Sequence, residues 1–129
     1  MAKREPSRPT KTELAILRVL WQLGPSTVRQ VHAHMSRARG VGYTTTLKLM
    51  QLMHEKGLLS RDEAERSHVY TPAVSEGKTQ RALVLELLER TFGGSAQRLI
   101  QSMLLAKKAS PQELQQIREL LDELERSEQ

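Results

Sequence analysis

The 129-residue chain contains no cysteine, few aromatic side chains and no long apolar run. Without cysteine it has no disulfides, no thiolate metal ligands and no Cys nucleophile. Aromatic residues make up only 3%, which leaves little material for a roomy aromatic pocket. No apolar run approaches the roughly 20 residues that span a bilayer, and no apolar segment follows the charged N-terminus. We therefore expect a cytoplasmic protein without membrane insertion, made of one ordinary domain or two very small ones.

Charge is distributed unevenly along the chain. Residues 1–81 carry 14 Lys and Arg against 7 Asp and Glu, a net charge of +7. Residues 82–129 carry 6 against 8, a net charge of −2. The cationic first part indicates a polyanion as partner, although charge alone leaves an ordinary basic surface about as good an explanation.

Local signals predict two helices in the first 40 residues. A capping box that starts at Thr10 begins the first helix, and Gly24 ends it. Thr27 begins a second, short helix that is expected to end near Ser36. A basic turn that contains glycine then leads to Gly42.

A third helix is expected over residues 43–57, with an apolar and a polar face. In a helix each residue is turned by about 100° from the one before it. The residues that then fall on the core face and its flanks are Thr46, Leu47, Leu49, Met50, Leu52 and Met53. The opposite face carries Thr44, Lys48, Gln51 and Glu55. Thr44 and Thr45 offer hydroxyls and methyls to DNA, Lys48 reaches guanine or phosphate, and Gln51 pairs with adenine. The alternative is an ordinary solvated face whose threonines only cap the helix.

The hydrophobic period changes after the third helix. Residues 58–61 and 67–71 alternate, which predicts two short strands around a polar tip at residues 62–66. Three helices followed by a hairpin is the order of a winged helix-turn-helix.

Four side chains around this hairpin and the third helix are candidate backbone contacts. Arg61, Arg66 and His68 of the hairpin are placed to straddle the DNA backbone beside the major groove. Tyr43, just before the third helix, is placed to pack on a sugar or donate to a phosphate. Surface hairpins also carry such charges with no partner, and a partly buried Tyr is common at a helix entrance.

Three further helices are predicted in the rest of the chain. One covers about residues 76–91, Ser95 caps the next, and Ser110 with Pro111 begins the last. Such short helices cannot bury enough apolar surface alone, so they either fold back on the first part or pair with a second copy. We expect a homodimer, which is the common symmetry of small DNA binders. The expected dimerisation residues are Leu83, Leu87, Leu99, Met103, Leu114, Ile117, Leu121 and Leu124.

The predicted fold class is mostly α, a winged helix-turn-helix followed by a three-helix dimerisation domain. Residues 1–9 form a basic tail, residues 10–73 the winged-helix domain and residues 74–129 the dimerisation domain.

An enzyme is the competing class. His54 and Glu55 begin like the zinc-protease motif HExxH, but Leu58 stands where the second ligand must be. His32 and His34 are two residues apart and point to different helix faces, which argues against a shared metal. We expect no catalytic residue, no metal and no cofactor. A winged helix used for protein contacts, or one that senses a small ligand, is a further alternative that salt-dependent DNA binding would distinguish.

Several segments together resemble one known family. They are GPSTVRQV, RGVGYTTTLKLMQLMHEKGLLSRDE, SHVYTPA and TQRALVLELLERTFGGSAQRLI. They resemble the BlaI/MecI family of penicillinase repressors over about residues 9–124. The resemblance implies a dimeric winged-helix repressor on a palindromic double-stranded DNA operator with TACA/TGTA-like half-sites. It places Thr44, Thr45, Lys48 and Gln51 in the major groove and the wing at residues 61–68 on the backbone.

The same resemblance implies how the DNA is released. In this family a membrane sensor with a zinc metalloprotease domain triggers cleavage of the repressor in its dimerisation region. The matching position lies near Ser102 and Met103, where the best-known members carry Asn-Phe. Copper-responsive relatives carry a Cys-rich tail, which is missing here, so copper sensing is disfavoured.

Overall fold

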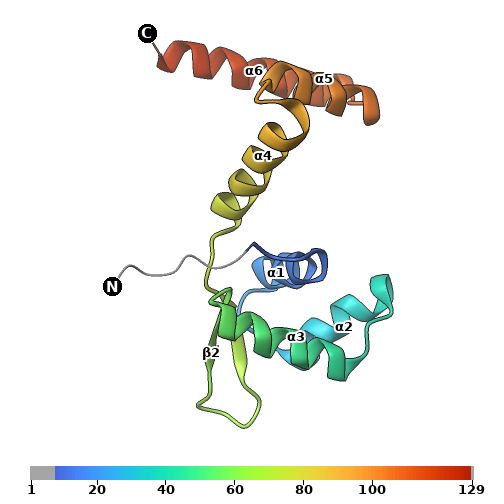
Figure 1. Ribbon diagram of the computed structural model, residues 1–129, viewed down its shortest axis with the longest axis vertical. Coiled ribbons are helices and arrows are strands. Elements are labelled where there is room, and N and C mark those ends of the chain that lie inside the picture. Colours follow the sequence, from blue (N-terminus) through green and yellow to red (C-terminus); the bar gives the residue numbers. More distant parts are fainter. Residues whose placement is uncertain (1–7, 129) are drawn as a thin grey trace. The chain divides into compact units, whose positions relative to one another are not determined.

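The structure is a computed structural model that describes residues 8–128, except the side chains of residues 36–39 (Figure 1). Its elements are α1 (Lys11–Leu23), β1 (Ser26–Thr27), α2 (Val28–Arg39), α3 (Tyr43–Lys56), β2 (Leu59–Asp62), β3 (Val69–Pro72), α4 (Glu76–Phe92), α5 (Ala96–Ala106) and α6 (Pro111–Ser127). Within the described residues no helix combines the length and apolar character needed to cross a membrane.

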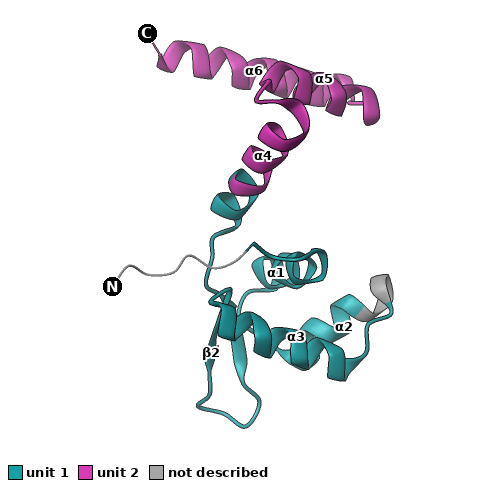
Figure 2. Ribbon diagram, in the orientation of Figure 1, with its two compact units in different colours: residues 1–81 teal, residues 82–129 magenta. Residues whose placement is uncertain are grey.

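The chain divides into two compact units, residues 1–81 and residues 82–129 (Figure 2). The division falls inside α4, whereas the sequence places a domain boundary before this helix, between residues 73 and 74. Most of the predicted basic tail, residues 1–7, lies outside the described residues.

Side chains begin the helices where the sequence predicts them. At α1 the backbone N–H of Glu13 donates to Thr10 Oγ1 over 3.2 Å, and the Thr10 N–H donates to Glu13 Oε1 over 2.9 Å. The Ser95 hydroxyl caps α5 and the Ser110 hydroxyl caps α6. Each cap satisfies a backbone donor that the helix itself leaves unpaired.

Helix α2 is longer than predicted. It continues to Arg39 instead of ending near Ser36, so the turn before α3 is confined to residues 40–42. Arg and Ala are good helix formers, so the basic segment that we expected to be a turn extends the helix. Gly40 ends it with a φ of +61°, a conformation that favours glycine.

A three-stranded antiparallel sheet in the order β1-β3-β2 completes the first unit. The hairpin of β2 and β3 confirms the predicted wing, with each strand shifted by one or two residues. Arg61 lies opposite Tyr70 in the register, and Ser26 pairs with Tyr70 from the other side. Strand β1 was not predicted, because two residues are too short to show an alternating pattern.

The core of the first unit lies between α1, α2, α3 and the sheet. Its buried apolar side chains are Ile16, Leu17, Leu20, Val28, Val31, Met35, Met50, Met53, Leu58, Leu59 and Tyr70. On α3, Thr46 is also buried, and its hydroxyl donates to the Gly42 carbonyl over 3.1 Å. Leu52, predicted as a flank of this core, is 40% exposed. It lies too far round the helix for the core side chains to cover it.

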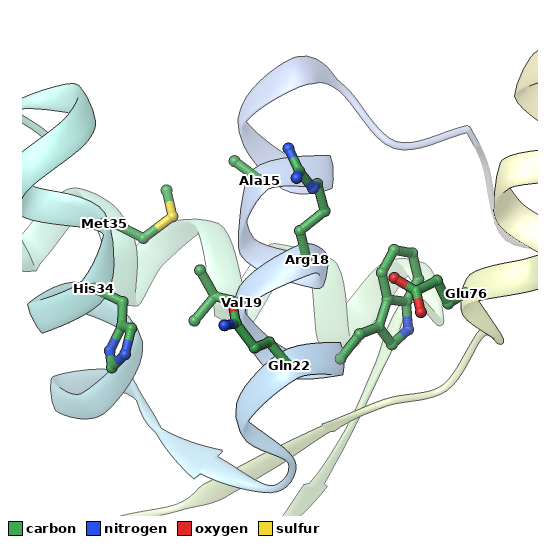
Figure 3. Close-up of a pocket in the computed structure, with 8 residues that line it drawn as sticks. Ala15, Arg18, Val19, Gln22, His34, Met35 and Glu76 are labelled. Atoms are coloured by element: carbon green, nitrogen blue, oxygen red, sulfur yellow. The ribbon is translucent and has the colours of Figure 1, made fainter. Parts of the chain in front are cut away.

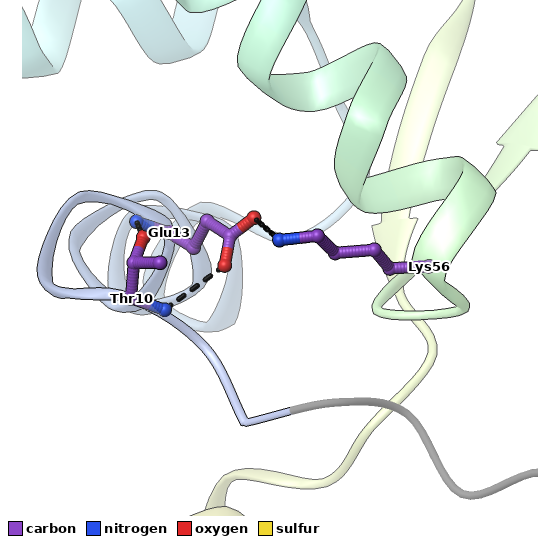
Figure 4. A network of polar contacts seen from close by, with 3 residues as sticks. All are labelled: Thr10, Glu13 and Lys56. Atoms are coloured by element: carbon purple, nitrogen blue, oxygen red, sulfur yellow. Dashed lines mark hydrogen bonds and ion pairs between the residues drawn. The ribbon is translucent and has the colours of Figure 1, made fainter.

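Two long-range hydrogen bonds tie distant parts of the first unit together. The buried Glu13 carboxylate accepts from Lys56 Nζ over 2.8 Å, which joins the start of α1 to the end of α3 (Figure 4). Burial alone would raise the pKa of Glu13, but the hydrogen bonds from Lys56 and Thr10 lower this pKa below its usual value. Trp21 Nε1 donates to the Val74 carbonyl over 3.1 Å, which holds the chain after β3 against α1.

Candidate nucleic-acid interface

The outer face of α3 presents the polar side chains that the sequence singles out. Thr44, Thr45, Lys48 and Gln51 are all exposed. None of them hydrogen-bonds or pairs with another side chain among the described residues. Because their donors and acceptors are uncommitted, they are available to an external partner. Their role in reading DNA stays a prediction.

The start of α3 is fixed without a side-chain cap of its own. Gly42 occupies the cap position and offers no side chain. The preceding turn is held instead by His32, whose Nε2 donates to the Val41 carbonyl over 3.0 Å. The His32 ring also meets the Tyr43 ring edge-on, with centroids 5.8 Å apart and an interplanar angle of 88°. Tyr43 is 41% exposed, so one side of its ring faces outward.

The three candidate residues of the wing differ in their exposure and in whether they form ion pairs. Arg61 is half-buried and forms an ion pair with Glu63. Its contact with Tyr70, followed by that with Glu63, raises the pKa of Arg61. Arg66 is exposed and makes no ion pair with the described residues, and His68 is half-buried. Arg66 is therefore the freest cation of the wing.

A groove of about 280 Å³ brings the helix and wing residues together. Tyr43, Gln51, Arg66 and His68 line it, whereas Thr44, Thr45, Lys48 and Arg61 do not. The first turn of α2 supplies another wall, including Arg29, which the sequence reasoning did not single out. The guanidinium carbon of Arg29 lies 5.7 Å from the Tyr43 ring centroid, over the ring. Only the fold brings these two residues together, since 14 positions separate them in the sequence.

A second groove, of about 530 Å³, opens on the surface of α1 (Figure 3). Arg18, Val19 and Gln22 project into it from α1, and His34 and Met35 border it from α2. His34 Nδ1 lies 3.3 Å from the Gln30 carbonyl, so this ring already has a partner. Within the described residues no group of three or more His, Asp or Glu is placed to hold a metal ion.

The second unit exposes most of its apolar side chains. Among its described residues, 82–128, none is buried. Of the predicted dimerisation residues, Leu83, Leu99, Leu114 and Ile117 are half-exposed, whereas Leu87, Met103, Leu121 and Leu124 are exposed. Further apolar side chains that were not predicted are also exposed, among them Leu105 at 80% and Leu120 at 54%. A segment of this length with no buried side chain lacks a hydrophobic core of its own.

The fold of the first unit, with its exposed helix face beside a hairpin, defines a winged-helix domain. It is similar to the solution structure of the DNA-binding domain of the repressor BlaI, with a TM-score of 0.51 and 24% identity over 58% of this chain and 90% of that one. It is also similar to the Bacillus licheniformis BlaI monomeric form in complex with the blaP half-operator, with a TM-score of 0.50 and 21% identity over 58% and 92% of the two chains. These likenesses and the mostly helical elements confirm the predicted winged-helix fold class, whereas dimerisation through the second unit stays a prediction.

Residues 9–123 match the penicillinase repressor family, and the chain belongs to that family. The family is one of repressors, not of enzymes. A transcriptional regulator BlaI of Mycobacterium tuberculosis is 32% identical over 77 residues, which cover 59% of this chain and 56% of that protein. The match therefore spans little more than half the length of this relative. The predicted family is confirmed.

Proposed function

We propose that the chain is a transcriptional repressor that acts as a homodimer on a palindromic operator of double-stranded DNA in the cytoplasm. Its membership of the penicillinase repressor family supports this function. The relative from Bacillus licheniformis, which shares the fold, is known in complex with a half-operator. A half-operator is one arm of a repeated site, which is what a two-fold symmetric protein recognises.

One observation supports DNA recognition most directly, the uncommitted outer face of α3. Thr44, Lys48 and Gln51 are exposed and have no partner among the described residues. Their spacing along one helix face suits entry into the major groove, where such side chains distinguish base edges. Arg66 and His68 in the wing then approach the sugar-phosphate backbone, together with Arg61 in strand β2 of the wing.

The exposed apolar side chains of the second unit support the proposed dimerisation. Leu121 and Leu124, on one face of α6, are 49% and 55% exposed. Pairing with a second copy removes such side chains from water, which is the main favourable term in association. A tethered pair of heads then gains the effective concentration that separate heads lack.

Release of the operator follows from cutting the second unit. We place the cut at the Ser102–Met103 bond, made by a membrane sensor metalloprotease, as the family resemblance implies. Ser102 and Met103 are both exposed in α5, and no side chain of α5 is buried. Local opening of this helix therefore costs little, which suits a protease that needs an extended substrate.

Selection from a pool of randomised 30-base-pair duplexes tests the DNA function. We expect the full chain to enrich two inverted half-sites whose centres lie about one helical turn, roughly 10 base pairs, or a multiple of it apart. Binding should weaken steeply as salt rises, because phosphate contacts release counterions. An unenriched pool, together with no binding to duplex DNA at low salt, would favour a protein adaptor over a repressor.

A further inference from the structure

The groove between the first turn of α2, α3 and the wing is strongly biased in charge. Arg29 and Arg66 line it, and none of its lining residues, all of them described, is an Asp or Glu. Tyr43, Ser67 and His68 also line it, beside the apolar Val28 and Leu47. A lining of cations and hydroxyls, with no carboxylate to repel an anion, suits phosphate oxygens.

Arg29 is held in an arrangement that leaves its donors free. Its guanidinium lies over the Tyr43 ring, and it forms no ion pair with the described residues. A cation over an aromatic ring uses its face, while the N–H groups of a guanidinium point outward in its plane. No hydrogen bond or ion pair with the described residues takes up the N–H groups of Arg29, so they are available to a phosphate.

The Tyr43 ring also contacts His32. His32 meets it edge-on, and the His32 Nε2–H is fixed to the Val41 carbonyl. A side chain that is ordered before binding loses less conformational entropy when it binds. Arg29 is thus positioned before binding by its contact with Tyr43, which in turn contacts His32, the residue that also holds the turn before α3.

We propose that Arg29 holds a backbone phosphate of the bound duplex in this groove, opposite the wing, and that Tyr43 positions it. The inference rests on the proposed DNA-binding function. It adds a third anchoring element, the first turn of α2, to the face of α3 and the wing. A contact to phosphate carries no sequence information, so Arg29 fixes register and orientation on the duplex instead of selecting bases.

The salt dependence of binding to a 30-base-pair duplex of arbitrary sequence tests this inference in the full chain. Each phosphate contact contributes about 0.9 to the slope of log affinity against log salt. Arg29→Ala should therefore lower the slope by about 1 per head and weaken binding about tenfold per head at 0.1 M salt. Arg29→Lys should keep the slope and lose part of the affinity, because lysine keeps the charge without the planar fork.

Arg18→Ala is the matched control, because Arg18 is an exposed arginine on α1 outside this groove. It should leave both slope and affinity close to wild type. Circular dichroism during urea unfolding should show Arg29→Ala to be as stable as wild type within about 0.5 kcal/mol, as for other surface changes.

A double-mutant cycle with Tyr43→Leu tests the positioning. If the ring orients Arg29, the two substitutions together should weaken binding less than the product of their separate effects. Independent effects would overturn the role of Tyr43. An Arg29→Ala slope equal to that of wild type would overturn the phosphate contact, while leaving the proposed function intact. Failure of the wild-type chain to bind any duplex would instead overturn the proposed function.

Discussion

Replacing two leucines on the exposed face of α6 should dissociate the proposed homodimer into single chains. Leu121 and Leu124 are about half exposed in the single chain. Full burial of a leucine contributes about 1.5 to 3 kcal/mol, so burying the exposed half contributes about 1 kcal/mol. Each substitution occurs twice in a two-fold dimer. Leu121→Ala with Leu124→Ala should therefore cost about 4 kcal/mol and raise the dimer dissociation constant about 1000-fold.

Sedimentation equilibrium of the wild type and the double variant measures this constant directly. Alanine is the best helix former, so α6 itself should persist and the helical circular dichroism should stay close to wild type. Gln116→Ala with Glu123→Ala is the matched control, because both residues are exposed on α6 and neither is one of the predicted dimerisation residues. The reasoning is refuted if the wild type is a monomer at tens of micromolar. It is equally refuted if the leucine variant dimerises as tightly as the control.

Three further outcomes are expected. Lys48→Ala should cost about 1 to 3 kcal/mol of operator affinity and relax selectivity at one base pair; titration of operator variants checks this, and uniform weakening would show a phosphate contact instead. Glu13→Gln should destabilise the fold by about 1 to 2 kcal/mol at pH 7; this energy is set low because Lys56 is 38% exposed and water screens its ion pair with Glu13. Since the pKa of Glu13 is lowered from 4.5, its contribution is present above that pH and lost as pH falls through the folded value. Urea unfolding across pH should thus depend less on pH below about 5 in the variant, and parallel curves would contradict this. A protease site engineered between Ser102 and Met103 should, when cut, yield monomers and release the operator, as sedimentation and anisotropy would report.

Much of the helical structure could be predicted because its signals are local. Thr10, Ser95 and Ser110 cap helices through their own side chains, and Gly57 ends α3 in a left-handed conformation. These signals need only a few neighbouring residues. The polar face of α3 was likewise predictable, since helical periodicity alone separates Lys48 from the core.

Features that depend on distant neighbours could not be predicted. Strand β1 is formed because Ser26 and Thr27 meet β3, and no local pattern marks it. Periodicity assigned Leu52 to the flank of the core, but only the packed fold shows that no neighbouring side chains cover it enough to bury it. Arg29 was missed because its contact with the Tyr43 ring exists only in the folded chain. The pairing of Arg61 with Glu63 similarly depends on how the hairpin turns.

No side chain of residues 82–128 is buried in the single chain, so the proposed dimerisation would make repression depend on the concentration of the protein. Since the population of pairs varies as the square of the population of single chains, modest changes in synthesis rate should alter promoter occupancy more than proportionally. A lone chain would carry an unprotected tail that housekeeping proteases degrade readily. A low concentration of the protein would thus speed its degradation, and repression would end abruptly.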